Sequence, residues 1–309
     1  MPYSLSNYED VFSLPYEQLS IDDYLESIRH KDIFRYRAKL VRAGDVLEVE
    51  IYPVWRENKA AEIRTKTGNP TRAVQKNLNR ENTRKHVSRL VHANFTNKDI
   101  WCTFDYRHEH TPADAKDAQK DIQNYIRRLR GYIKKNGLPD LKYIYVTEWA
   151  VNEETGETYA HHHIIMNFRD RDIAEKFWTK GFRLQSRRLE SDDYGLEGLA
   201  RYIAKPETKR KNRKGQKTYA NSTNLTQPDI VCSEYRLPGT NYRMSKKRAM
   251  ELATNENVVR QVLEEYYSNH TIPAGGVKIK FSQYVSGAYI YARMMRKPTQ
   301  RKRKERSSE

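Results

Sequence analysis

The chain has 309 residues, enough for one large domain or two smaller ones with buried cores. Its 57 lysines and arginines exceed its 40 aspartates and glutamates, which gives a formal net charge of +17 at pH 7. A surplus of this size favours a polyanionic partner, most often nucleic acid. Cys102 and Cys232 form no spaced framework, which excludes a disulfide scaffold and a zinc knuckle. The sequence shows neither a signal peptide nor an apolar run of membrane-spanning length, so we expect a soluble, cytoplasmic protein with no membrane partner.

The first predicted element is a β-hairpin between residues 32 and 56. Polar and apolar residues alternate on both sides of Ala43-Gly44-Asp45, as expected for two strands joined by a tight turn. Residues 57–98 are basic and favour a helix after a turn at Gly68-Asn69-Pro70. We describe residues 1–97 together as an N-terminal extension.

The central segment, residues 98–230, has the clearest pattern of elements. In chain order it predicts a strand at 100–106, a helix that ends at Asn136-Gly137, strands at about 142–150 and 158–168, a short helix at about 170–178, a strand at about 181–189 and a helix at about 193–205. The order β-α-β-β-α-β is that of the split βαβ, or ferredoxin-like, plan. We therefore predict an α+β domain with one antiparallel sheet and helices on one of its faces.

The long helix of this segment has signals at both ends. Thr111-Pro112 offers an N-cap and a first-turn proline. Apolar residues then recur at steps of three and four, and the predicted core-facing stripe comprises Ile122, Tyr125, Ile126, Leu129, Tyr132 and Ile133. Asn136-Gly137 ends the helix, after Lys134 and Lys135 in the last turn.

The remainder of the chain is more basic and less regular. A basic stretch at 207–219 comes after the central elements. We describe residues 231–309 as a C-terminal helical extension, with a helix at about 245–267. A basic tail occupies residues 301–306.

The most informative segment reads Y-A-H-H-H-I-I-M-N-F, at residues 159–168. Alternate residues of a strand face the same side, so His161 and His163 project together while His162 points away. Two imidazoles on one face of a strand can bind a single divalent ion. The alternative is a solvent-exposed histidine run on an edge strand, with no metal.

A carboxylate in the preceding strand completes the predicted metal site. If the two strands are joined by a turn at Thr155-Gly156, Glu148 lies opposite His163, at about 5 Å. A slip of one residue in register would rotate this pairing. Two histidines and one carboxylate leave coordination positions open, as in a catalytic site, and suit Mg or Mn as well as Zn.

The last predicted helix carries a tyrosine beside its buried stripe, which comprises Leu196, Leu199, Ala200 and Ile203. Tyr202 lies at the edge of this stripe, and Lys205 is its i+3 neighbour. A phenol needs help to act as a nucleophile at neutral pH, which a lysine ammonium and a divalent ion can supply. Tyr194 is a second candidate nucleophile, although a structural or DNA-stacking role suits it better.

Three motifs occur in the order found in one known superfamily. W-C-T-F-D-Y at 101–106, H-H-H-I-I at 161–165 and Y-I-A-K at 202–205 resemble the HUH endonucleases, in particular the rolling-circle replication initiator (Rep) proteins of plasmids and small phages. The resemblance covers roughly residues 98–230, including T-Y-A-N-S-T-N-L-T-Q-P after the basic stretch.

This resemblance implies a role for each motif residue. His161 and His163 would be the metal ligands, Glu148 an auxiliary ligand, Tyr202 the nucleophile and Lys205 its partner. The family usually has a bulky apolar residue where this chain has His162, which leaves the ligand pair ambiguous. Gly198 and Pro206 lie four positions before and after Tyr202, which favours a single-tyrosine site. The sequence has no phosphate-binding loop of the kind that a fused helicase needs.

The implied function is replication initiation. The protein would nick one strand at an origin by metal-dependent transesterification and form a 5′-phosphotyrosine intermediate, with Mg or Mn as cofactor. Its partners would be single-stranded or hairpin origin DNA and host replication proteins. A transposase or relaxase would share this chemistry, but relaxases usually place the tyrosine before the histidines. A non-catalytic single-stranded nucleic-acid-binding protein fits the charge and the tyrosine content equally well.

Overall fold

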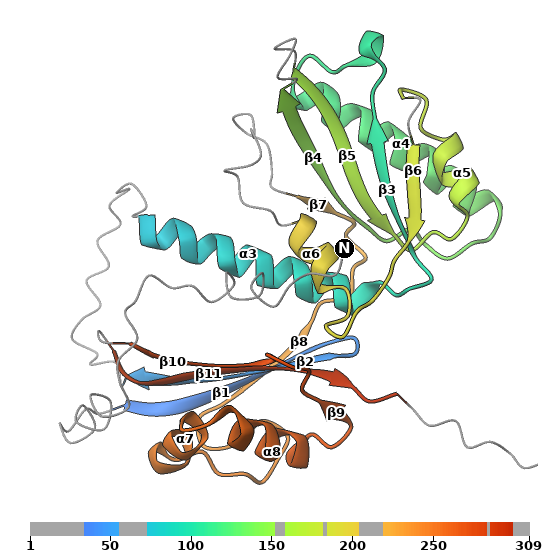
Figure 1. Cartoon of the computed structure of the whole chain (residues 1–309). Helices are drawn as coiled ribbons and strands as arrows, with labels where there is room; N and C mark the ends of the chain where they lie inside the picture. The colour runs from blue at the N-terminus through green and yellow to red at the C-terminus, as the bar shows by residue number, and fades with distance from the viewer. Residues whose placement is uncertain are drawn as a thin grey trace, which may run out of the picture. The chain divides into compact units, whose positions relative to one another are not determined.

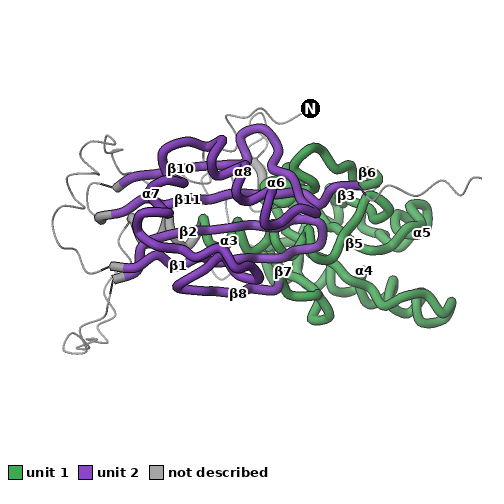
Figure 2. Tube along the Cα trace, turned by 90° about the horizontal axis from the view of Figure 1, so that it is seen from below, with its two compact units in different colours: residues 1–13, 64–228 green, residues 14–63, 229–309 purple. Residues whose placement is uncertain are grey.

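The computed structural model describes residues 34–55, 73–151, 158–181, 184–203, 219–282 and 285–298. The chain divides into two compact units, unit 1 with residues 1–13 and 64–228 and unit 2 with residues 14–63 and 229–309 (Figure 2). Several sequence-predicted features lie outside the described residues: the turns at Gly68-Asn69-Pro70 and Thr155-Gly156, Lys205, Pro206, most of the basic stretch at 207–219, and the basic tail.

Unit 1 contains the predicted β-α-β-β-α-β segment and the helix that comes after it (Figure 1). Its elements are β3 (Ile100–Asp105), α4 (Ala115–Lys135), β4 (Tyr143–Val151), β5 (Thr158–Met166), α5 (Arg171–Lys176), β6 (Leu184–Arg188) and α6 (Glu197–Ile203). The sheet has the order β6-β3-β5-β4-β7, where β7 is the short strand Ala220–Asn221, and all its pairs are antiparallel. The predicted α+β fold is therefore confirmed.

Helix α4 begins later than the sequence predicts. Its N-cap is Asp114, whose carboxylate accepts hydrogen bonds from the backbone N–H groups of Lys116 and Asp117, at 2.8 and 2.9 Å. The expected cap, Thr111, instead comes directly after the short 3-10 helix His108–His110. An aspartate satisfies two of the unpaired N–H groups at the helix start, and its charge suits the positive end of the helix dipole.

The other end of α4 agrees with the prediction. Asn136 caps the helix, and Gly137 adopts a left-handed φ of 62°. The N–H of Leu138 then reaches back to the carbonyl of Ile133 at 3.0 Å, which is the hydrogen bond of a Schellman motif. The predicted stripe is buried, except for Tyr132, which is half-buried.

The two faces of the unit 1 sheet are covered by different helices. The first face packs against α4 and α5, through a core that includes Phe104, Ile164 and Leu129. The opposite face packs against α6 and α3 (Ala73–Asn94), through a core that includes Ile165 and Leu90. The sequence predicted helices on one face of the sheet. The two helices of the βαββαβ segment, α4 and α5, do share one face, and α3 and α6 cover the other. We name the face covered by α3 and α6 the site face.

Unit 2 is built on a second antiparallel sheet. Its elements are β1 (Phe34–Ala43), β2 (Val46–Trp55), β8 (Asp229–Ser233), α7 (Lys246–Ala253), α8 (Glu256–Tyr266), β9 (His270–Thr271), β10 (Val277–Ser282) and β11 (Val285–Arg296). The strand order is β10-β11-β2-β1-β8, with β9 paired to β11. The predicted hairpin is β1–β2, which turns at Gly44-Asp45 with a left-handed φ of 59° at Gly44.

The C-terminal part of unit 2 differs from the prediction in two ways. The single helix expected over 245–267 is two helices, because the Asn255 side chain accepts from the N–H of Asn257 and caps α8 as a new helix. Strands β10 and β11 were not predicted, and β11 pairs with β2 across more than 230 residues of sequence. Among the described residues, no helix combines the length and apolar character needed to cross a membrane.

Two glycines of unit 1 provide a matched test of this packing. A Cβ at Gly181 would overlap the backbone carbonyl of Asp105, which already accepts from the Trp178 indole at 2.8 Å. A Cβ at Gly131, within α4, would meet no atom within 4 Å. We predict that Gly181→Ala lowers the free energy of unfolding by about 1–3 kcal/mol. Gly131→Ala should raise it by about 0.5–1 kcal/mol, because alanine favours helix.

Urea unfolding followed by circular dichroism measures both effects. Equal stabilities for the two variants would contradict the close approach at Gly181.

Candidate active site

The pleat of β5 separates the three adjacent histidines. His161 and His163 lie on the site face, and His162 lies on the face that packs against α4 and α5. Glu148 pairs directly with His161, not with His163 as predicted from the sequence. The observed pairing runs from Tyr143 and Met166 to Val151 and Thr158, which is a register two residues away from the predicted one. A shift of two residues leaves Glu148 on the same face.

Three side chains converge on the site face. Glu148 Oε2 lies 3.0 Å from His161 Nε2 and 3.4 Å from His163 Nε2. One ligand atom from each residue lies within 4.8 Å of the other two, so the cluster could hold a metal ion. All three side chains are largely buried, with exposed fractions of 13%, 17% and 6% in the order given. A carboxylate oxygen and two imidazole nitrogens suit a divalent cation and leave further coordination positions open.

A polar chain from β3 orients His163. The indole N–H of Trp101 donates to Thr103 Oγ1 at 3.2 Å, and this oxygen lies 3.0 Å from His163 Nδ1. Trp101 also stacks on His163, with ring centroids 5.1 Å apart and an interplanar angle of 21°. When Nδ1 donates to Thr103, the lone pair of Nε2 is available on the side of Glu148. A hydrogen bond of this kind, to the nitrogen that faces away from the metal, commonly fixes the tautomer of a metal-binding histidine.

His162 has a different environment. Its ring is fully buried and lies between the Tyr106 hydroxyl, 2.7 Å from Nε2, and Thr147 Oγ1, 2.9 Å from Nδ1. Burial, with the nearby His161 and His163, lowers the pKa of His162 to about 3. The ring is therefore neutral, and both of its nitrogens have protein partners. The sequence motif left open which two of the three histidines are ligands. In this geometry His162 lies apart from the cluster, which contains His161 and His163.

Tyr202 reaches the cluster from α6. Its hydroxyl lies 3.0 Å from His163 Nε2, the same nitrogen that lies near Glu148. Its ring packs edge-on against His163 and Trp101, with centroid distances of 5.0 and 5.4 Å. The predicted stripe of α6 is buried at Leu196, Ala200 and Ile203, with Tyr202 half-buried beside it. Lys205, the predicted partner of Tyr202, lies outside the described residues.

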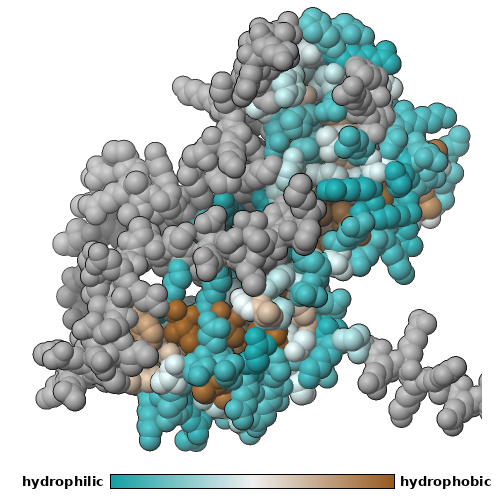
Figure 3. Space-filling view, viewed as in Figure 1, coloured by the Kyte–Doolittle hydropathy of each residue, from teal (hydrophilic) through white to brown (hydrophobic). Residues whose placement is uncertain are grey.

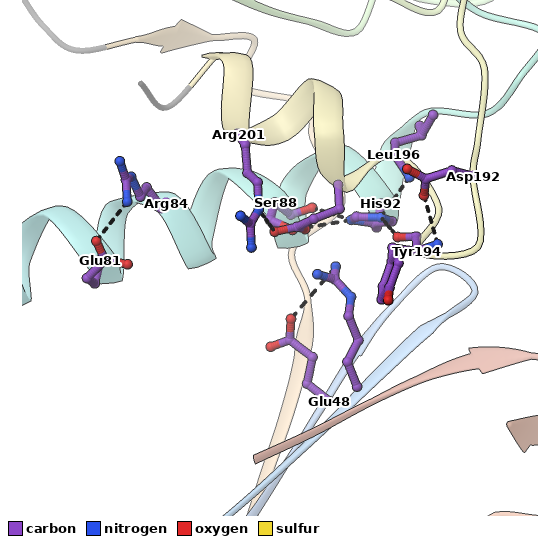
Figure 4. Close-up of polar contacts among 11 residues, drawn as sticks. Glu48, Glu81, Arg84, Ser88, His92, Asp192, Tyr194, Leu196 and Arg201 are labelled. Atoms are coloured by element: carbon purple, nitrogen blue, oxygen red, sulfur yellow. Dashed lines mark hydrogen bonds and ion pairs between the residues drawn. The ribbon is translucent and has the colours of Figure 1, made fainter. Parts of the chain in front are cut away.

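Helix α3 supports α6 through a second set of polar contacts (Figure 4). The buried Ser88 hydroxyl donates to the buried Glu197 carboxylate at the start of α6, and Arg201 donates to its other oxygen at 3.1 Å. His92 Nε2 accepts from the backbone N–H of Leu196 at 3.0 Å. The proton of this neutral ring is therefore on Nδ1, which donates to the Ser88 carbonyl at 2.7 Å. These contacts set the position of the helix that carries Tyr202.

Tyr194 lies in the turn before α6. Asp192 and Gly195 exchange backbone hydrogen bonds at 3.0 and 2.9 Å, and the N–H of Tyr194 donates to the Asp192 carboxylate at 2.7 Å (Figure 4). Burial, together with Asp192 and Asp193, raises the pKa of Tyr194 above its usual value. This environment opposes formation of the phenolate that a nucleophilic tyrosine requires.

Several residues that support the site were not predicted from the sequence. Trp101 and Thr103 had no predicted role, although both lie within the first-strand motif. Ser88 and His92 were also missed, because a serine and a histidine in a basic helix carry no local signal. Both contact residues at the start of α6 that lie more than 100 positions later in the chain.

Comparison with known protein families gave a match for the central part of the chain. Residues 99–211 match the family model described as Replication-associated protein ORF2/G2P. This segment is similar to replication-associated proteins. It runs from β3 through α6 and includes Glu148, His161, His163 and Tyr202. No curated protein and no solved structure matches the chain.

Metal binding by the cluster can be measured directly. We predict that Glu148→Ala and His161→Ala each weaken Mn²⁺ binding by more than about 10-fold, since losing even a hydrogen-bond partner of a ligand commonly costs that much. Isothermal titration calorimetry of the full chain measures the effect. His86→Ala, which removes an exposed histidine of α3, is the matched control and should bind Mn²⁺ like the wild type. Unchanged binding in both cluster variants would contradict a metal site here.

The support of α6 by α3 predicts a stability difference. Ser88→Ala removes a donor from the buried carboxylate of Glu197, which should lower the free energy of unfolding by about 1–3 kcal/mol. Ser191→Ala is the control, because its exposed hydroxyl accepts only from the Asn97 side chain among the described residues, at 2.9 Å. This control should change stability by less than about 0.5 kcal/mol. Equal losses in the two variants in urea unfolding would argue against the contact.

Proposed function

We propose that this protein is a DNA-nicking enzyme that starts rolling-circle replication, with Tyr202 as its nucleophile. The observation that carries the proposal is the position of the Tyr202 hydroxyl, 3.0 Å from His163 Nε2 and therefore at the edge of the possible metal cluster. The match of residues 99–211 to a replication-associated family supports the same function. The net charge of +17 suits a DNA substrate.

The reaction is a transesterification at phosphorus. The phenolic oxygen of Tyr202 attacks the scissile phosphorus and forms a tyrosine–phosphate bond, while the bond from phosphorus to the 3′ oxygen breaks. The phenolic proton passes to solvent, and the departing 3′ oxygen takes up a proton. The product is a 5′-phosphotyrosine and a free 3′ hydroxyl, from which a polymerase can extend. Because one phosphoester replaces another, the strand can later be rejoined.

The residues on the site face have separate tasks in this reaction. Glu148, His161 and His163 would hold a divalent cation, such as Mg or Mn, whose charge stabilises the phosphorane-like transition state when it is bound. Thr103 and Trp101 keep His163 in one orientation. The edge-on packing of Tyr202 against Trp101 and His163 limits the positions that its hydroxyl can reach. We assign to Lys205, from its position in the sequence three residues after Tyr202, the stabilisation of the phenolate and of the phosphate charge.

Other functions are compatible with parts of this description. A transposase or relaxase would use the same nucleophile and cluster, and differs in the step after the nick. A non-catalytic single-stranded nucleic-acid-binding protein is favoured by the net charge, but gives no reason for a tyrosine hydroxyl beside a Glu/His/His cluster.

A covalent adduct tests the proposal. Single-stranded DNA with a randomised centre, free or within a hairpin, carries one dye at its 5′ end and another at its 3′ end. Incubated with the full chain and Mn²⁺, the wild type should retain the 3′ dye on a denaturing protein gel and release the 5′ dye as a shorter strand. Retention of the 3′ dye alone identifies a 5′-phosphotyrosine linkage.

Two variants complete this test. Tyr202→Phe removes one oxygen and should lower adduct formation by at least about 100-fold, because no other group replaces the nucleophile. Tyr194→Phe is the matched control and should form the adduct like the wild type. An adduct of normal yield in Tyr202→Phe, or none with any DNA in the wild type, would exclude the proposed function.

A further inference from the structure

Beyond the nucleophile and the metal cluster, the site face carries an exposed tyrosine. Tyr159 lies on β5, two residues before His161, and the pleat places it on the same face as His161 and His163. Its exposed fraction is 45%, whereas those of the His161 and His163 side chains are 17% and 6%. The surface of unit 1 visible in Figure 3 is largely hydrophilic. The exposed ring of Tyr159 has an aromatic face and a hydroxyl, both of which can contact a ligand at this surface.

The ring of Tyr159 is aligned with the cluster. It stacks on His161, with centroids 6.2 Å apart and planes inclined by 29°. His161 in turn meets His163 edge-on at 4.7 Å, and His163 stacks on Trp101. The neighbouring core residues Trp149 and Ala160 belong to the opposite face of the sheet. Tyr159 is thus the exposed end of a row of rings that crosses the cluster.

We propose that Tyr159 stacks a base of the bound DNA strand next to the scissile phosphate and is a positioning residue for the substrate. This inference rests on the proposed nicking function. Along β5, Tyr159 lies roughly 7 Å from His161, which is close to the spacing of neighbouring nucleotides in an extended single strand. A base stacked there would leave the adjacent phosphate at the cluster, within reach of Tyr202.

The β6 edge of the site face suits the phosphates of the same DNA strand. Arg187 on β6 pairs with Trp101, and Gln185 pairs with Thr103, so both lie on the site face, and both are exposed. Among the described residues, no ion pair of Arg187 is found. A strand that runs from Tyr159 over the cluster towards β6 would therefore meet an aromatic ring first and a guanidinium beyond the cluster. Stacking and backbone charge are the two elements that single-strand binding sites combine.

The experiment measures binding without cleavage. Tyr202→Phe supplies a non-cleaving background, and the DNA is the single strand found to be nicked by the wild type. Each base within three nucleotides of the nick is replaced in turn by an abasic residue, and dissociation constants are measured by fluorescence anisotropy. We expect removal of one base adjacent to the nick to weaken binding by about 5-fold to 100-fold, the usual range for base stacking on an aromatic side chain.

Substitution of Tyr159 should abolish this sensitivity. In the Tyr202→Phe background, Tyr159→Ala should bind the intact strand as weakly as the Tyr202→Phe protein binds the abasic strand. Removal of the base should then weaken binding by the Tyr159→Ala protein no further. Tyr159→Phe keeps the ring and should behave as the starting protein. Tyr235→Ala removes a tyrosine that is 68% exposed in unit 2 and is the control for loss of a surface aromatic residue. Mn²⁺ affinity should be unchanged in all of them.

The outcomes separate the two proposals. If the wild type nicks DNA but Tyr159→Ala keeps both the affinity and the abasic sensitivity of its parent, the stacking role is excluded and the nicking function stands. If no abasic position near the nick weakens DNA binding by the Tyr202→Phe protein, in which Tyr159 is intact, the stacking role is excluded without any variant of Tyr159. Absence of nicking by the wild type contradicts the proposed function itself.

Discussion

The site depends on the alternation of side chains along β5. Three consecutive histidines cannot share one environment in a strand, because neighbouring residues point to opposite faces. His161 and His163 therefore reach the site face, where Glu148 lies within 3.4 Å of both. His162 enters the core on the other side and is held by Tyr106 and Thr147. One strand thus contributes to the possible metal cluster and to the packing of α4 and α5.

The nucleophile candidate depends on a different constraint. Tyr202 is on α6, of which the structure describes seven residues, and a helical segment of that length is not stable alone. Its position therefore depends on tertiary contacts. Helix α3 provides these through Ser88 and His92, and the buried Glu197 joins the two helices. The segment that matches the replication-associated family begins after α3. The part of the chain that positions Tyr202 therefore extends further towards the N-terminus than the matched residues. A fragment that starts at residue 99 would lack the contacts by which α3 supports α6.

Local patterns in the sequence predict much of unit 1. The alternation of β5 identifies which histidines face together, and Gly137 marks a helix end that requires positive φ. In unit 2, Gly44 marks the turn of the predicted hairpin in the same way. The prediction was wrong where the answer depends on distant contacts or on competition between neighbours. Glu148 was assigned to His163 because the predicted register of β4 and β5 differs by two residues from the observed one, and a difference of two residues left the faces unchanged. Asp114 caps α4 in place of Thr111, because its carboxylate accepts two N–H groups. The pairing of β2 with β11 has no local signal at all.

The central claim is that Tyr202 becomes covalently joined to DNA. The most direct measurement is mass spectrometry of the protein after reaction with single-stranded DNA and Mn²⁺, with the DNA trimmed by nuclease and the protein digested with trypsin. Cleavage after Arg201 gives a peptide that begins at Tyr202. We predict a phosphodeoxynucleotide on that tyrosine and on no other residue. A nucleotide found on Tyr194 or elsewhere, with Tyr202 unmodified, would contradict the claim.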